Sequence, residues 1–387
     1  MSSRGTIAIA GSVAQKPRQA GHTWQFLQYL LGFRRLGWDV LLLDRLEPAM
    51  CVDRAGRPVD CEHSENLRYV VETMADFGLQ DAYSVDLGGG RTVGLARDAV
   101  LERLRSSAVL LNVMGFLEDE ELLAAAPRRA FVDTDPGFGQ MWRDLGWADL
   151  FGGHDVHLTI AERIGEPDCA IPMCGIDWVR FHQPVVLDCW PVHDGAAATR
   201  FTSIGSWRGP YDAIDYDGTR YGLRAHEFRR FADVPRRAQG GFEVALDIDP
   251  VETGDLERLA AGGWQLVDPG PIGHTPATYR EYVRGSLGEF LVAKGMYVTA
   301  RSGWFSERSI CYLAAGRPVV AQDTGLAGLY PLGRGLLPYA TPEEAVACVE
   351  EVVADYPRHS RAARALAEEH FDSDRVLPDL LDKVGVR

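Results

Sequence analysis

Two aspartates separated by one residue, at the end of an apolar run, form the first group in this sequence with evident chemistry. Asp133 and Asp135 follow Phe131 and Val132, which predict a buried strand. Carboxylates at this spacing can chelate Mg²⁺ or Mn²⁺ bridged to a diphosphate. At a strand end they can also orient an imidazole or bind substrate hydroxyl groups, and in the simplest case they form a turn before Pro136.

A histidine follows the first predicted strand. His22 comes after Gly21, in the loop between the strand predicted for residues 6–10 and a helix. At the carboxyl end of a strand, an imidazole has a pKa suited to removing a proton from an acceptor hydroxyl. The alternative is a histidine that only caps or packs against the helix. Both alternatives stay open on the residues alone; if His22 acts as a base, Asp133 or Asp135 can orient it or bind acceptor hydroxyls.

The most informative segment begins at Arg301. It predicts a small-residue turn at Ser302 and Gly303, then an amphipathic helix, a Gly-Arg-Pro stop and a buried strand. Backbone N–H groups in such a turn, at the start of a helix, favour anions and especially phosphate. Arg308 in the helix, or Arg301 itself, can add a guanidinium. The alternative is a serine N-cap beside a surface arginine.

A second loop of small residues, 205–209, follows the strand predicted for residues 200–204. Its Arg208 is a candidate for contact with a diphosphate, and the alternative is a β-turn with an exposed arginine. Lys294 is one of only three lysines in the chain. Few lysines beside many arginines are typical of a biased nucleotide composition of the genome, so we assign this lysine no role.

Strand-like and helix-like runs alternate along the chain. This pattern predicts βαβ units and parallel sheets. The predicted strands are residues 6–10, 40–43, 108–113, 130–133, 156–160, 200–204, 242–246, 296–300 and 317–321. The predicted helices are residues 24–36, 97–105, 225–231, 276–291, 306–314, 343–353 and 361–381. Ligands of open α/β sheets bind outside the carboxyl ends of the strands, so a cleft between two such units is the expected site.

The alternation is interrupted by a stretch rich in Pro, Gly, His and Ala with poor periodicity. We therefore predict a first domain over residues 1–178, a linker over 179–198 and a second domain over 199–365. A final helical segment, 366–387, completes the chain.

The segment 314–320, Ala-Ala-Gly-Arg-Pro-Val-Val, with Gln322 and Asp323 after it, resembles the C-terminal domain of GT-B nucleotide-sugar glycosyltransferases of the group 1 type. The similarity is strong over residues 296–330 and architectural elsewhere. It implies two Rossmann-like domains facing a cleft, with the C-terminal helix crossing back to the first domain. The first domain would bind the acceptor and the second the nucleotide-sugar donor. In such enzymes the helix and its preceding loop hold the diphosphate, which implies Gln322 and Asp323 as partners of sugar hydroxyls.

The sequence departs from this family at two positions. Retaining members usually carry two glutamates eight positions apart, and this chain has Gly303 and Cys311 there. The usual ribose contact is therefore missing, and Glu307, in the next turn, is a candidate substitute. Inverting members place their base histidine where His22 lies.

The expected function is a glycosyltransferase that moves a sugar from a nucleoside-diphosphate sugar to a hydroxyl-bearing small molecule or glycan, by inversion and without a metal or other cofactor. The predicted donor-binding residues are Arg208, Ser302, Gly303, Ser306, Glu307, Arg308, Gln322 and Asp323, and the predicted catalytic residues are His22, Asp133 and Asp135. A nucleotide-sugar epimerase of the same fold is the main alternative. A nicotinamide-dependent oxidoreductase is disfavoured because residues 8–13 lack Gly-x-Gly-x-x-Gly, and an exported sugar-binding protein because no signal peptide is evident.

The composition of the chain argues against several other classes of protein. The 387 residues carry a formal net charge of −15, so the basic surface expected of a nucleic-acid-binding protein is absent. The longest apolar region, 24–43, is interrupted by charges and is no membrane span, although peripheral membrane contact stays open. The seven cysteines are scattered without a Cys-x-x-Cys pair, which favours free thiols in a reducing compartment, and a cytoplasmic location follows by default.

Overall fold

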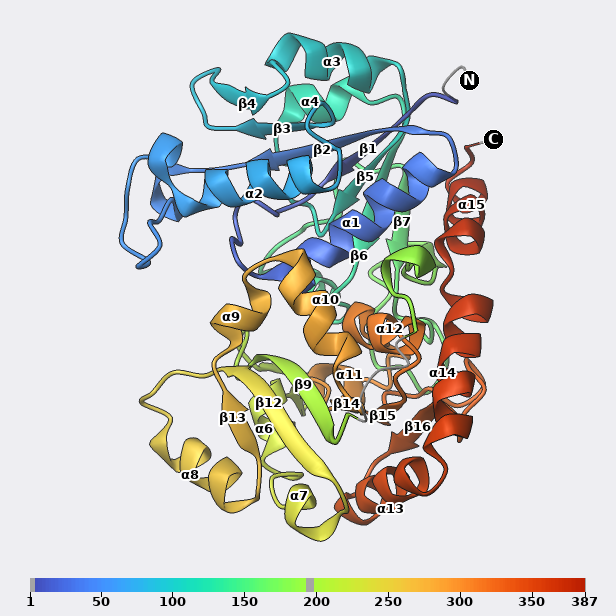
Figure 1. Ribbon diagram of the computed structural model, residues 1–387. Coiled ribbons are helices and arrows are strands. Elements are labelled where there is room, and N and C mark those ends of the chain that lie inside the picture. The colour runs from blue at the N-terminus through green and yellow to red at the C-terminus, as the bar shows by residue number, and fades with distance from the viewer. Residues whose placement is uncertain (1–3, 193–197, 387) are drawn as a thin grey trace.

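The computed structural model describes residues 4–192 and 198–386. In this part of the chain the strands form two large sheets, one of eight and one of six strands, and a two-stranded hairpin. Figure 1 shows the first sheet in the upper half of the molecule and the second in the lower half. Both sheets have helices packed around them, as the alternating pattern predicts.

The first sheet has the order β4-β3-β2-β1-β5-β6-β7-β8. Its strands are β1 (Thr6–Ala10), β2 (Asp39–Arg45), β3 (Tyr83–Asp86), β4 (Thr92–Gly94), β5 (Ser107–Val113), β6 (Arg129–Asp133), β7 (Val156–Thr159) and β8 (Trp178–Arg180). Neighbouring strands are parallel except for the edge pair β3 and β4. The central strands are covered on both faces, which explains their continuous apolar runs. The helices of this half are α1 (Ala20–Arg35), α2 (Glu65–Asp76), α3 (Arg97–Arg105), α4 (Glu120–Ala125) and α5 (Phe138–Asp144).

The second sheet has the order β13-β12-β9-β14-β15-β16 and is parallel throughout. Its strands are β9 (Arg200–Ser206), β12 (Gly241–Asp247), β13 (Gln265–Val267), β14 (Gly288–Leu291), β15 (Val319–Gln322) and β16 (Leu336–Tyr339), and the hairpin is β10 (Ile214–Tyr216) with β11 (Thr219–Tyr221). In chain order within this half, the sheet reads 3-2-1-4-5-6, which is the Rossmann arrangement. Its helices are α6 (Arg224–Phe228), α7 (Val234–Arg237), α8 (Thr253–Ala261), α9 (Pro269–Gly273), α10 (Pro276–Arg284), α11 (Gly295–Thr299) and α12 (Glu307–Ala314).

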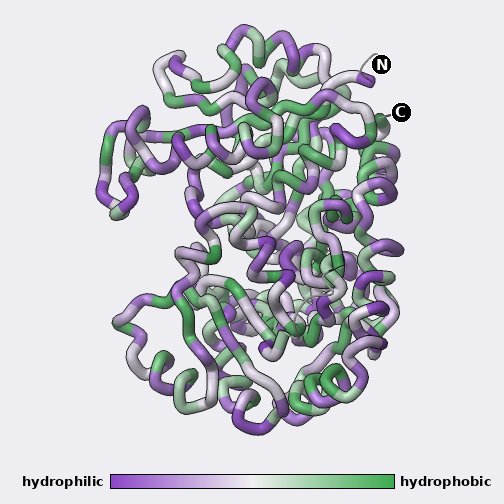
Figure 2. The backbone as a smooth tube through the Cα atoms, in the orientation of Figure 1, coloured by the Kyte–Doolittle hydropathy of each residue, from purple (hydrophilic) through white to green (hydrophobic). Residues whose placement is uncertain are grey.

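The last helices connect the two halves. In Figure 1, α13 (Pro342–Ala354), α14 (Tyr356–His370) and α15 (Ser373–Lys383) run from the second sheet up the side of the molecule to the first. Along this segment Figure 2 shows hydrophobic and hydrophilic residues alternating, as expected of helices with one buried face. α15 packs on α1, where Leu377 fills the space above Gly32 and Arg35 forms an ion pair with Asp374 at 2.9 Å. The predicted return of the C-terminal helix to the first half is confirmed.

Three predicted elements differ from the structure. Residues 276–291 do not form one helix, because α10 ends at Gly285 and the following residues form β14. Residues 296–300, predicted as a strand, form helix α11. Their buried residues, Met296, Tyr297 and Ala300, have a spacing that one helical turn also satisfies, so periodicity alone could not distinguish the two. The helical tail is broken at Phe371, and Asp372 caps the new helix α15.

The expectation that every cysteine is a free thiol is wrong for one pair. Cys51 and Cys61 form a disulfide, with their Cα atoms 5.1 Å apart. Val52 and Pro58 pair as an isolated bridge that folds the intervening loop back on itself, so two cysteines ten residues apart come together. The other five cysteines are free: Cys169, Cys174, Cys189, Cys311 and Cys348.

The limits of the two domains stay a prediction. The first sheet continues to Arg180, two residues beyond the predicted end of the first domain, and the second begins at Arg200. Part of the predicted linker, residues 193–197, lies outside the described residues. Among the helices that the structure describes, none is long and apolar enough to cross a membrane.

Candidate functional site

A pocket of about 260 Å³ lies between the two halves, and we call it the cleft pocket. From the first half, it is lined by the segments that follow β1, β5 and β6. From the second half, it is lined by the segments that follow β9 and β14 and by the start of α12. Carboxyl ends of parallel strands from both sheets therefore meet there, where ligands of α/β folds bind.

His22 lies in the first turn of α1 and faces this pocket. Its Nε2 shares a hydrogen bond of 2.8 Å with Ser12 Oγ. The ring packs edge-on against Phe26 and Phe116, with centroids 5.1 and 6.4 Å away. Burial, and secondarily the charge of Lys16, hold the pKa of His22 well below its usual range. The imidazole is therefore neutral at physiological pH, which is the state that a base requires.

The two aspartates diverge. Asp133 is buried and accepts hydrogen bonds from Gln140 Nε2 at 2.7 Å and Thr159 Oγ1 at 2.8 Å, and burial raises its pKa to about 6. Asp135 faces the cleft pocket, where it accepts hydrogen bonds from Lys294 and Tyr297. Neither aspartate shares one of these hydrogen bonds with His22, whose Nε2 pairs with Ser12, so a role in orienting the ring or in binding acceptor hydroxyls stays a prediction. The pair also does not converge on one point, as a shared metal would require.

The turn at Ser302 and Gly303 faces away from the cleft pocket. Its N–H groups donate to Tyr297 O at 3.2 Å and Thr324 O at 2.8 Å. The Ser302 carbonyl accepts from Arg163 N of the first half at 3.1 Å. Backbone groups already used in this way cannot bind phosphate, so that part of the prediction is wrong. The turn instead joins the two halves.

The start of α12 does line the cleft pocket, through Ser306, Glu307 and Arg308. Ser306 is the N-cap and accepts from Arg308 N at 3.2 Å. Arg308 donates from Nε to the fully buried Glu289 at 2.6 Å. Its Nη2 is buried and has no hydrogen-bond partner among the described residues. A guanidinium fixed at one end and unsatisfied at the other can bind an anion at the helix start.

Two arginines line the cleft pocket beyond the carboxyl end of β9: Arg208, which was predicted, and Arg224, which was not. Arg208 is half exposed and ion-paired with Glu252. Arg224 opens α6 and is half-buried, and its buried Nε has no hydrogen-bond partner within the residues described. Its Nη1 occupies the space that a Cβ on Gly205 would fill. Burial, and secondarily the nearby Arg308, lower the pKa of Arg224 to about 10. Sequence analysis missed this arginine because it lies sixteen residues after Arg208, outside the predicted loop.

Two of the chain's three lysines meet at the cleft pocket. Lys294 Nζ binds Asp135 of the first half at 2.6 Å. Lys16 enters from the loop after β1, and burial lowers its pKa. The rarity of lysine was the only sequence signal for these two residues.

Three other predicted candidates do not line the cleft pocket. Gln322 is buried, accepts from Ala293 N and donates to Glu227. Asp323 accepts from the N–H groups of the turn that follows it. Arg301 forms an ion pair with Asp168.

The electrostatic character of the cleft pocket is the opposite of that of the whole chain. Five basic side chains line it against two carboxylates, Asp135 and Glu307. The basic residues are Lys16, Arg208, Arg224, Lys294 and Arg308. In a protein of net charge −15, this concentration of positive charge indicates a site for an anion carrying several charges.

Neither a protein-family model nor any curated protein sequence matches the chain. Solved structures do match it over nearly its whole length. One is an α-glucosyltransferase in complex with UDP and a 13-mer DNA (TM-score 0.56, 11% identity, covering 98% of this chain and 99% of that one). Anabaena HepE in complex with UDP-glucose has a TM-score of 0.58 at 10% identity, covering 98% and 99%. Sucrose-phosphate synthase from Thermosynechococcus elongatus has a TM-score of 0.51 at 10% identity, covering 98% of each chain.

At these identities the likeness establishes the fold and no more. The chain has the GT-B fold, with two Rossmann-like halves facing a cleft. The similarity noted for residues 296–330 is therefore confirmed at the level of architecture.

Proposed function

We propose that this protein is a glycosyltransferase that moves a sugar from a nucleoside-diphosphate sugar to a hydroxyl group of a small molecule or glycan. The observation that carries the proposal is the set of five basic side chains around a neutral histidine in the cleft pocket. A diphosphate is the ligand whose charge matches the arginines and lysines, and an acceptor hydroxyl is the group that the imidazole can deprotonate.

Arg224 and Arg308 are the proposed principal contacts of the diphosphate. Arg308 is buried and Arg224 half-buried, and each has a buried guanidinium nitrogen without a hydrogen-bond partner among the described residues. Ser306 and the start of α12 add N–H groups and the positive end of a helix dipole. Arg208 and Lys294, each now paired with a carboxylate, can exchange that carboxylate for phosphate oxygens. Glu307, at the mouth of the same helix, is the proposed ribose partner.

In the proposed transfer, the neutral imidazole of His22 takes the proton of the acceptor hydroxyl as the acceptor oxygen bonds to the anomeric carbon of the donor. The bond from that carbon to the diphosphate breaks, and the nucleoside diphosphate leaves with the electron pair. The basic side chains stabilise the negative charge that develops on it. Attack from the face opposite the leaving group inverts the anomeric centre. Because these cations supply the neutralising charge, we propose that no divalent metal is needed.

Names of similar structures support the choice of probe. UDP or UDP-glucose is bound in the α-glucosyltransferase and HepE structures, so we propose UDP as the first nucleotide to test. The DNA in one of them is no guide to the acceptor here, since the net charge of −15 disfavours a nucleic acid.

A cytoplasmic location stays part of the proposal. The Cys51–Cys61 disulfide argues against the reducing compartment on which that location partly rested.

The epimerase alternative requires acid and base carboxylates on the donor side of the cleft. Of the two candidates there, Glu307 lines the cleft pocket, whereas Asp323 is bound to its own turn. A transferase needs no such pair.

The deciding experiment is calorimetric titration of the protein with UDP, in EDTA and again in Mg²⁺, followed by incubation with UDP-glucose and a panel of hydroxyl acceptors. We expect UDP to bind in EDTA and a β-linked product to form from the α-linked donor. UDP binding that requires Mg²⁺ would overturn the metal-independent mechanism. Conversion of a UDP-sugar to its epimer without transfer would establish the alternative.

A further inference from the structure

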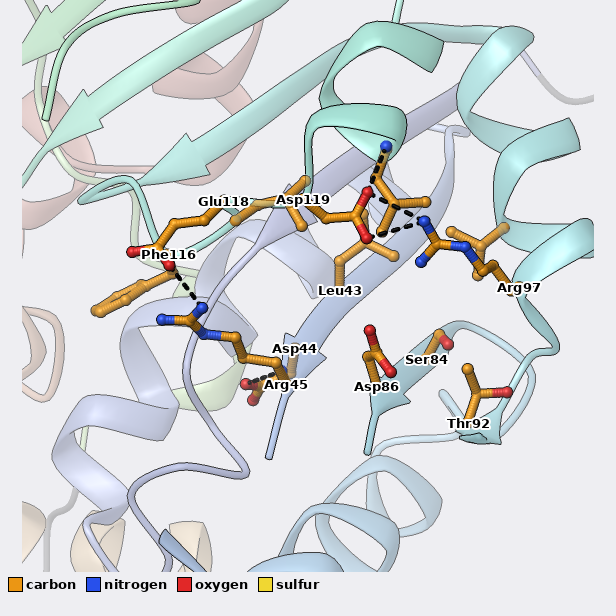
Figure 3. A pocket seen from close by; sticks show the side chains of 13 residues that line it. Leu43, Asp44, Arg45, Ser84, Asp86, Thr92, Arg97, Phe116, Glu118 and Asp119 are labelled. Atoms are coloured by element: carbon orange, nitrogen blue, oxygen red, sulfur yellow. Dashed lines mark hydrogen bonds and ion pairs between the residues drawn. The ribbon is translucent and has the colours of Figure 1, made fainter. Parts of the chain in front are cut away.

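The first half contains a second pocket that the proposed donor does not use. We call it the N-terminal pocket; it has a volume of about 310 Å³ and lies at the carboxyl ends of β2 and β3, beside β4 and the loop that leads into α4. Figure 3 shows its lining. Like the cleft pocket, it lies where the topology of a parallel sheet places ligands.

One side of the N-terminal pocket is polar, and its arginines are already neutralised. Arg45 forms an ion pair with Glu118 at 2.6 Å, and Arg97 binds Asp119 at 2.8 Å (Figure 3). Asp86 forms no ion pair with any residue that the structure describes, and its Oδ1 accepts the N–H of Gly88 at 2.8 Å. In Figure 3 its carboxylate points from the end of β3 across the pocket toward Asp119.

The balance of charge in the N-terminal pocket is therefore negative. Four carboxyl groups line it against two guanidinium groups. Burial raises the pKa of Asp44 to about 7, so the other three carry most of the negative charge, and Asp86 is the partly exposed one without an ion pair in the described chain. Thr92 on β4 pairs with Asp86 on β3 and also lines the pocket. A negative pocket repels a phosphorylated or carboxylated ligand and favours a protonated amine beside hydroxyl groups.

The other side is apolar. Four aliphatic side chains of one hydrophobic cluster form this side, and their wall suits the C–H face of a sugar or cyclitol ring. They are Leu43, Val100, Leu117 and Leu122.

The N-terminal pocket adjoins the cleft pocket. Phe116 lines both, and its ring meets the ring of His22. Asp44, in the wall of the N-terminal pocket, accepts Ala14 N at 2.6 Å and Gln15 Nε2 at 3.1 Å. It thereby holds the loop from which Lys16 enters the cleft. A ligand ring in the N-terminal pocket is separated from the catalytic imidazole by one phenyl ring.

We propose that the N-terminal pocket binds the acceptor, and that this acceptor is an amino sugar or aminocyclitol whose ammonium group binds Asp86. The identification as acceptor rests on the proposed function; the preference for an amine rests on the pocket itself. With its amine at Asp86 and its ring on the aliphatic wall, such a ligand has further hydroxyl groups on the side of Phe116, which borders the cleft pocket.

The test is equilibrium binding of three sugars of equal size and different charge: D-glucosamine, D-glucose and D-glucuronate. Each is titrated by saturation-transfer NMR without any nucleotide, and UDP is titrated separately by calorimetry. We expect D-glucosamine to bind at least about fivefold more tightly than D-glucose, and D-glucuronate to bind most weakly.

Two variants make the result specific. Asp86→Asn keeps an oxygen for the Gly88 N–H and removes the charge, so it should abolish the preference for D-glucosamine. Asp81→Asn removes a carboxylate at the opposite, amino end of the same strand and should retain the preference. Equal binding of all three sugars, or a preference that survives Asp86→Asn, would overturn the proposal. If the unmodified protein binds no UDP but still prefers D-glucosamine, the proposed transferase activity is overturned and the proposed amine site is retained.

Discussion

The two pockets occupy equivalent places in the topology and have opposite chemistry. Both lie at the carboxyl ends of parallel strands. The cleft pocket sets five cations against two carboxylates, whereas the N-terminal pocket sets four carboxyl groups against two guanidinium groups. The difference teaches that the sheet decides where a ligand binds, and that a few side chains at the strand ends decide which ligand it is.

The largest expected effect separates catalysis from binding in the cleft pocket. His22→Ala should lower kcat by about 10²- to 10⁴-fold, the usual contribution of a general base, while the Kd of UDP stays unchanged. Steady-state kinetics and calorimetry measure the two quantities. Ser12→Ala removes only the hydrogen-bond partner of the ring and should cost much less. A His22→Ala enzyme with full activity would show that the base lies elsewhere.

The next effect tests whether the cations of the cleft pocket bind the donor. Arg224→Met should weaken UDP binding by about 10- to 100-fold, the value of one or two charged hydrogen bonds. Gly205→Ala should act in the same direction, because its Cβ would displace the Arg224 guanidinium.

Gly254→Ala is the matched control for the glycine change. Gly254 lies in α8, and nothing lies within 4 Å of a Cβ placed on it. If Gly205→Ala and Gly254→Ala bind UDP alike, the packing of Arg224 against Gly205 plays no part in donor binding.

A smaller change should make the contrast between the pockets sharper. Asp135→Asn removes one of the two carboxylates of the cleft pocket and releases Lys294 from its ion pair. We expect UDP to bind a few-fold more tightly, with the gain lost at high salt because the charges are screened. Calorimetry at 50 and 500 mM NaCl measures both. Weaker UDP binding in this variant would mean that Asp135 positions Lys294 for the diphosphate.

The smallest effect is a displaced pH profile. A base must be neutral, and His22 is neutral above its pKa, which burial holds well below 6.5. The acid limb of log kcat/KM, which reports the free enzyme, should therefore lie below pH 6.5, with no change between pH 7 and 8. An acid limb at or above pH 6.5 would contradict a buried neutral histidine.

Several parts of the candidate site could be read from local sequence. The helix 307–314 with its serine cap, the Gly-Arg-Pro stop and the strand after it occur almost as predicted. His22 and Arg208 also reach the cleft pocket. These features depend on neighbours within a few residues, such as a capping hydroxyl or a strand end, so short-range patterns carry them.

Other parts could not be read in that way. Ser302 and Gly303 have the composition of a phosphate loop, but their N–H groups bind carbonyls from residues 297 and 324. Cys51 and Cys61 gave no recognisable spacing and still form a disulfide. In each case the deciding partner comes from another part of the backbone, and its position depends on the packing of whole elements.

The sequence by itself determined the alternation of strands and helices, and with it two parallel sheets whose carboxyl ends hold His22 and Arg208, because periodicity and capping are local properties. Tertiary structure alone decided which charges meet. Lys16, Asp135, Arg224 and Lys294 are far apart in the chain, and only the facing of the two halves places them around one pocket. Electrostatic interaction depends on distance in space, which the linear order of residues does not contain.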